Sequence, residues 1–148
     1  MQADEMKKIV LVGNPNIGKS AVFSRLTGAK VIASNYPGTT VEYNKGLLRI
    51  PDGEKVEILD IPGIYSLEAS TRAEQVALDI IKESDIIINV VDATNLERNL
   101  NLTVQLFKKF QIPAVIALNM TDIANHHGIT IDAEKLSVRL GLPVVPTV

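Results

Sequence analysis

The stretch that decides the fold is "KKIVLVGNPNIGKS", residues 7–20, in which an apolar run leads into a loop with two glycines. The run 7–12 reads as a buried strand, and residues 19–28 read as a helix that ends at Gly28. Short β-branched runs and amphipathic stretches continue to alternate along the rest of the chain. This alternation is typical of an α/β fold.

The other expected elements are read from hydrophobic periodicity and turn signals. Asp52-Gly53 is a strong hairpin signal between two strands. Residues 29–42 have no clean period and contain Pro37-Gly38, so we expect a loop there. Strands are expected at 43–50, 55–61, 85–92, 113–119 and 143–148, and helices at 71–83, 97–110 and 132–140. The sequence therefore predicts a doubly wound, mostly parallel sheet with helices on both faces and one antiparallel edge.

Length and composition indicate one soluble domain over residues 1–148. The chain is 46% apolar and 22% charged, has a net charge of −2, and contains no cysteine. A nucleic-acid-binding face is not indicated, and disulfides and thiolate metal sites are excluded. The amino-terminal "MQADEMKK" lacks the apolar core of a signal peptide. The chain stops as its last strand begins, so we expect a fragment of a longer protein.

The loop after the first strand matches the pattern G-x-x-x-x-G-K-[ST] through Gly13, Gly18, Lys19 and Ser20. Glycines let the backbone curl so that several N–H groups and the helix N-terminus face one anion. The lysine can reach the β- and γ-phosphates, and the serine hydroxyl is an oxygen ligand suited to Mg²⁺. The alternative is an ordinary glycine-rich turn, but the strand before and the helix after favour a phosphate loop.

Two further motifs lie at the ends of predicted strands. "LDIPG" supplies Asp60, which can hold Mg²⁺ through water, and Gly63, whose N–H can meet a γ-phosphate. "NMTD" supplies Asn119 and Asp122, and a carboxylate there accepts the two N–H donors that guanine has and adenine lacks. Each motif is weak alone. Both occupy the strand ends where doubly wound sheets bind ligands, so together they indicate a guanine nucleotide site.

The set "GNPNIGKS", "YPGTTVE", "DIPGIYSL" and "NMTD" resembles the small P-loop GTPase fold. In detail it resembles the cytosolic N-terminal G domain of the ferrous iron transport protein B family of bacteria. The resemblance implies Mg²⁺-dependent hydrolysis of GTP to GDP by a switch domain that regulates iron(II) transport. It also implies a cytoplasmic domain joined to a membrane-embedded iron transport domain of the same full-length chain, which would lie in the bacterial inner membrane.

Further partners implied are small cytosolic accessory proteins and a second copy in a homo-oligomer. Two other functions remain open. One is a soluble RNA- or ribosome-associated GTPase, and the other is a guanine-nucleotide-binding module with negligible turnover.

The resemblance carries roles onto particular residues. Lys19, Asn16, Thr40 and Gly63 would take part in catalysis, with switch I over 30–42 and switch II over 61–72. Mg²⁺ would be held by Ser20, Thr40 and Asp60. The nucleotide would be held by Gly13, Asn14, Pro15, Asn16, Ile17, Gly18, Lys19, Ser20, Ala21, Asn119, Met120 and Asp122.

Departures from the common GTPase pattern bear on mechanism. Ile64 stands where many GTPases carry a water-orienting glutamine, and Met120 replaces the usual base-recognition lysine. Arginine fingers are not obvious, since Arg25 and Arg72 read as solvated helix residues. By resemblance, Asn16 helps to bind K⁺, although a turn residue is the alternative. We therefore expect slow hydrolysis that is faster in K⁺ than in Na⁺.

Four other residues are read as structural. His126 and His127 are expected in a solvated loop, since adjacent side chains point apart on an extended chain. Glu68 is expected to be exposed rather than to orient a water. Tyr36 is left open between packing near the nucleotide and lying on a mobile loop.

Overall fold

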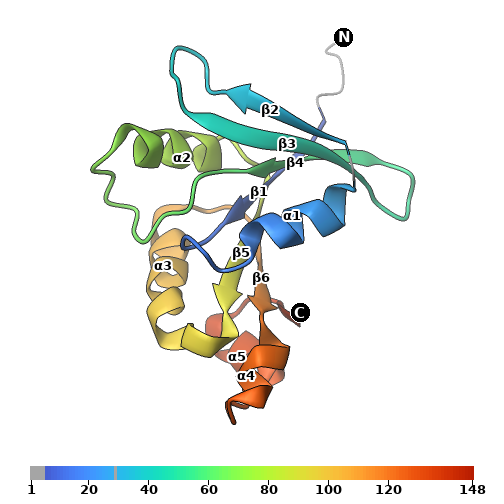
Figure 1. Ribbon diagram of the computed structural model, residues 1–148, viewed down its shortest axis with the longest axis vertical. Helices are drawn as coiled ribbons and strands as arrows, with labels where there is room; N and C mark the ends of the chain where they lie inside the picture. Colours follow the sequence, from blue (N-terminus) through green and yellow to red (C-terminus); the bar gives the residue numbers. More distant parts are fainter. Residues whose placement is uncertain (1–5, 29) are drawn as a thin grey trace.

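The computed structural model describes residues 6–28 and 30–148 (Figure 1). Residues 1–5, part of the amino-terminal segment without a signal-peptide pattern, and Ala29, where the predicted loop begins, lie outside the described residues. Within the described ranges, no helix is long and apolar enough to cross a membrane.

Strands and helices alternate along most of the chain. Their order is β1 (Lys8–Val12), α1 (Lys19–Thr27), β2 (Val31–Asn35), β3 (Glu42–Arg49), β4 (Lys55–Asp60), α2 (Arg72–Lys82), β5 (Ile86–Asp92), η1 (Ala93–Asn95), α3 (Leu96–Lys109), β6 (Ala114–Asn119), α4 (Thr121–His126), α5 (Ala133–Leu140) and β7 (Val144–Pro146).

The strands form one 7-stranded sheet in the order β2-β3-β4-β1-β5-β6-β7. β4, β1, β5, β6 and β7 run parallel, whereas β2 and β3 pair antiparallel at one edge. The predicted mostly parallel sheet with an antiparallel edge is therefore confirmed. The carboxyl ends of β1, β4, β5 and β6 meet at one edge of the sheet, as they do in any parallel arrangement.

Helices cover both faces of the sheet, which is why the central strands are apolar on both sides (Figure 1). On one face α2 and α3 pack on a core that includes Val10, Leu59 and Ile87, and α5 extends this layer over β6. On the other face α1 packs through Phe23 on Leu11 and its neighbours.

Three elements were not predicted from the sequence, one of them the short 3-10 helix η1 that follows β5. Residues 31–35, expected within a loop, form strand β2, and residues 121–126 form the unexpected helix α4. β2 lies at the sheet edge with neither face buried, so its sequence has no alternation of apolar and polar residues to reveal it. α4 is too short to show a helical period, and Ala124 is its buried residue.

Candidate functional site

The loop between β1 and α1 curls tightly around its own peptide groups. Asn16 and Gly18 both have left-handed backbone conformations, with φ of 62° and 82°. A Cβ on Gly18 would overlap the side chain of Asn119, and a Cβ on Gly13 would overlap Ile17. Glycine is therefore required at both positions.

Lys19 is the first residue of α1, and its ammonium group is held at the mouth of this loop. The Nζ atom donates to Oδ1 of Asp60 and, at 2.5 Å, to the carbonyl oxygen of Ile61. Both side chains are buried, with 10% of Lys19 and 6% of Asp60 exposed. A buried pair of opposite charges thus joins the phosphate loop to the carboxyl end of β4, whereas Ser20 is exposed on the first turn of α1.

A pocket of about 470 Å³ opens beside this ion pair. Its walls are residues 14–20 of the loop, residues 42–44 of β3 and residues 60–63 after β4. Gly63 approaches the loop so closely that a Cβ would lie 2.8 Å from backbone atoms of Pro15. The pocket combines a cation, a carboxylate, a hydroxyl and backbone amides, and this donor set fits a phosphate chain with a hard divalent metal.

Asn14 lies deeper in the same loop and is 4% exposed. Its Oδ1 is a buried side-chain oxygen for which the described residues provide no hydrogen-bond partner. An unpaired buried acceptor costs free energy, so it marks a place where a donor from a ligand or a rearranged loop would be stabilising.

The predicted base-reading residues lie at the neighbouring strand end. Asn119 ends β6, and its Nδ2 donates to the carbonyl oxygen of Ile17 at 3.0 Å. Its Oδ1 accepts from the hydroxyl of Thr147 at 2.9 Å. Asn119 therefore ties the phosphate loop to the end of β7, while Asp122 is exposed in the first turn of α4.

Two other predicted nucleotide contacts flank this region. Met120 has φ of 62°, and its Cε lies 3.4 Å from the Cβ position of Gly18, so its side chain covers the phosphate loop. Ala21 lines a separate hollow of about 320 Å³ together with Asn119 and Thr147.

Thr40, predicted to ligate Mg²⁺, does not line the phosphate pocket. It is exposed and lines a shallow hollow with Gly38, Thr39 and Arg72. Switch I is held there by its own contacts. The Tyr36 amide donates to Val41 O at 2.9 Å, and the Tyr36 hydroxyl donates to Glu83 at 3.0 Å.

The bond with Glu83 raises the pKa of Tyr36 above its ordinary value, with smaller effects from burial and nearby carboxylates. Tyr36 therefore lies against the end of α2 and not near the phosphate pocket. Of the two interpretations left open from the sequence, neither describes this contact.

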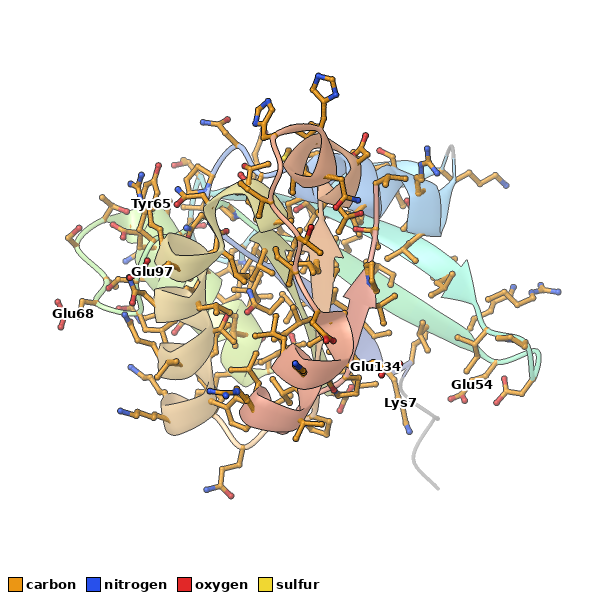
Figure 2. All side chains as sticks on the ribbon, turned by 90° about the horizontal axis from the view of Figure 1, so that it is seen from below. Lys7, Glu54, Tyr65, Glu68, Glu97 and Glu134 are labelled. Atoms are coloured by element: carbon orange, nitrogen blue, oxygen red, sulfur yellow. The ribbon has the colours of Figure 1, made fainter. Side chains whose placement is uncertain are left out.

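The residues read as structural have the following places. His126, expected in a loop, ends helix α4, and His127 follows it; both are exposed, with ring centroids 6.0 Å apart. Glu68 projects from the loop between β4 and α2 into solvent (Figure 2). Arg25 is exposed on α1, and Arg72 begins α2.

Sequence reasoning missed several residues of the site. Glu42 and Asn44 line the pocket, and their signal was their position: Glu42 ends the segment "YPGTTVE", and Asn44 lies two residues beyond it. Thr147 anchors Asn119 from far along the chain, and a lone threonine in the sequence carries no signal of that role.

Comparisons with known proteins agree with this geometry. The family model described as ferrous iron transport protein B matches residues 7–148. A relative from Salmonella typhimurium, an Fe(2+) transporter, is 46% identical over 97% of this chain and 19% of its own length. An Fe(2+) transport protein A/Fe(2+) transporter fusion protein from Porphyromonas gingivalis is 47% identical over 95% of this chain and 17% of its own length.

A solved structure of similar fold is the cytosolic domain of the T. maritima FeoB iron transporter in a GDP form. It is 35% identical, with a TM-score of 0.91, over 99% of this chain and 57% of that chain. This chain thus spans about a fifth of the length of the curated relatives that it matches. On the family-model match and these identities, the chain belongs to the ferrous iron transport protein B family.

Proposed function

We propose that residues 1–148 form the G domain of a longer membrane protein, and that this domain binds GTP with Mg²⁺ and hydrolyses it to GDP and phosphate. The observation that carries the proposal is the pocket in which Lys19 meets Asp60 beside a curled amide loop. The GDP form of the T. maritima relative supports a guanine nucleotide at this place.

Each group of the pocket has a role in this proposal. The loop amides and Lys19 bind the phosphates, and Asp122 accepts hydrogen bonds from the guanine N–H donors. Asn119 holds the loop in place through its hydrogen bond to Ile17. Ser20 and Asp60 supply oxygen ligands for Mg²⁺. When bound, Mg²⁺ neutralises charge that develops on the transferred phosphoryl group.

Hydrolysis requires the switches to close over the γ-phosphate. Thr40 would have to leave its exposed position to serve as a ligand of Mg²⁺, and the Gly63 amide would have to face the γ-phosphate. Ile64 is 2% exposed and apolar, so it cannot orient the attacking water. Backbone groups of the switches would then hold the water, and Asn16 would be the residue that holds K⁺, whose charge would offset the developing negative charge, so we expect slow turnover that K⁺ stimulates.

The proposed setting is bacterial iron(II) transport. The curated relatives are described as Fe(2+) transporters, and the matched segment is a small part of each. The domain would lie in the cytoplasm and regulate a membrane-embedded transport domain of the same chain. The fused protein of P. gingivalis supports a small accessory protein as a further partner, and a second copy in a homo-oligomer remains proposed.

The decisive experiment separates binding from turnover. Calorimetry with Mg²⁺ should detect binding of GDP and of a non-hydrolysable GTP analogue, and no comparable binding of ATP. Phosphate release under single-turnover conditions should then be faster in K⁺ than in Na⁺. Binding without release would support the module with negligible turnover, which buried Ile64 favours, and absence of binding would overturn the proposal.

A further inference from the structure

Ile64, which directly follows Gly63, faces the apolar core, so its side chain cannot place a water. If the proposed hydrolysis takes place here, its geometry depends on where the backbone of residues 63–67 lies. A misplacement of about 1 Å can cost a large factor in rate, so whatever fixes this backbone affects catalysis. The inference rests on the proposed function.

Two hydrogen bonds hold this backbone, one at each end. The Ile64 amide donates to the carbonyl oxygen of Gly13 at 3.0 Å. The Leu67 amide donates to Oε1 of Gln105 at 2.8 Å. The first bond ties the segment to the phosphate loop, and the second ties it to helix α3.

α3 presents a continuous ridge to this segment. Arg98, Leu102 and Gln105 are spaced i, i+4 and i+7, which places them on one side of the helix. The guanidinium carbon of Arg98 lies 5.2 Å from the ring centroid of Tyr65, and Leu102 shares a core cluster with Leu67. Figure 2 shows Tyr65 beside the start of α3, near Glu97.

The same helix is braced to the phosphate loop from its other side. The hydroxyl of Thr103 donates to Oδ1 of Asn89 at 2.5 Å, and Nδ2 of Asn89 donates to the carbonyl oxygen of Val12 at 3.1 Å. Thr103 and Asn89 are each 2% exposed, so water does not compete for these bonds. Val12 directly precedes Gly13, so α3 is fixed to the base of the phosphate loop.

We propose that Gln105 is a positioning residue for GTP hydrolysis. Its Oε1 fixes the Leu67 amide relative to α3, and α3 is fixed relative to the phosphate loop through Thr103 and Asn89. The Gly63 amide and the adjacent carbonyl groups are thereby aligned with the γ-phosphate. Gln105 acts through the backbone and does not touch the nucleotide.

The test compares variants that differ in one atom's ability to accept a hydrogen bond. Gln105→Met keeps the length of the side chain and removes the acceptor, whereas Gln105→Glu keeps the acceptor. Lys108→Met, on an exposed position of the same helix, controls for the new methionine. Single-turnover phosphate release in Mg²⁺ and K⁺ is measured beside the affinity for a non-hydrolysable GTP analogue.

Gln105→Met should slow release by about tenfold while the analogue affinity stays within about twofold of wild type. Gln105→Glu and Lys108→Met should retain rates within about threefold of wild type.

Three results would overturn the role of Gln105 while leaving hydrolysis intact. They are a wild-type rate in Gln105→Met, a loss of analogue affinity in parallel with the rate, and equal impairment in Gln105→Glu. A wild-type protein that binds GTP and releases no phosphate contradicts the proposed enzymatic activity instead, so the two failures are distinguishable.

Discussion

Tyr36 fastens switch I to the carboxyl end of α2, and removal of its hydroxyl should raise the preference for GTP over GDP. The hydroxyl donates to Glu83 at 3.0 Å, and Glu83 directly follows the last residue of α2. While this bond is present, Thr40 lies outside the phosphate pocket. The bond therefore stabilises an arrangement that GTP and Mg²⁺ would have to displace.

The size of the effect follows from the exposure of the bond. Hydrogen bonds to charged groups contribute up to about 3 kcal/mol when sheltered, but solvent weakens this exposed pair, and we take about 1 kcal/mol. A bond that exists in one arrangement shifts the equilibrium by its own free energy. One kcal/mol corresponds to about a fivefold change in the ratio of the two nucleotide affinities.

The assay is calorimetric titration of GDP and of a non-hydrolysable GTP analogue in Mg²⁺, for wild type, Tyr36→Phe, Glu83→Ala and the double variant. Each single variant should raise the analogue-to-GDP affinity ratio by about fivefold, and the double variant should raise it no further. Asp79→Asn removes a charge from α2 without removing the bond, so it serves as the matched control.

The pKa of Tyr36 sets the pH range for this test. Its pKa is raised by the bond to Glu83, so the folded protein favours the protonated phenol. The stabilisation is present below the unfolded pKa of about 10 and is lost as pH rises through the higher folded pKa. Titrations near pH 7.5 therefore measure the intact bond. A Tyr36→Phe ratio equal to wild type, or additive effects in the double variant, would refute the reasoning.

Three further outcomes are expected. Gly46→Ala should lower stability by about 1–3 kcal/mol in thermal unfolding, because the new Cβ would overlap the Thr27 side chain, and the analogue-to-GDP ratio should not change. Asp122→Asn should weaken the binding of guanine nucleotides and strengthen the binding of xanthine nucleotides, whose base accepts hydrogen bonds where guanine donates them. An unchanged preference in competition binding would show that Asp122 does not read the base. Asn16→Ala should abolish the excess of the K⁺ rate over the Na⁺ rate in single-turnover release, and a persisting excess would place the K⁺ effect elsewhere.

The sequence predicted the central sheet and the phosphate loop because strong local constraints act there. Residues 9–12 must be apolar to lie between two helical layers, and Gly18 must adopt a left-handed conformation beside Asn119. Such constraints leave a pattern that can be read without knowledge of the fold.

Other features depend on contacts between distant residues and left no local pattern. β2 has neither face buried, so its pairing with β3 could not be read from periodicity. The bond from Leu67 to Gln105 spans 38 positions, and a glutamine on a helix surface is compatible with many environments. The position of Thr40 depends on the arrangement that switch I adopts, and a threonine is compatible both with the exposed position seen here and with the proposed position beside the metal.

The ion pair between Lys19 and Asp60 has a consequence for how ligands enter. Each charge is already neutralised by the other within the protein. A phosphate group that bound Lys19 alone would leave the Asp60 carboxylate without a counter-charge, and a metal that bound Asp60 alone would leave the Lys19 ammonium without one. When both arrive together, each protein charge exchanges one counter-ion for another. Nucleotide and divalent cation should therefore enter as mutually dependent ligands, each weak in isolation, and a lone free phosphate should compete poorly.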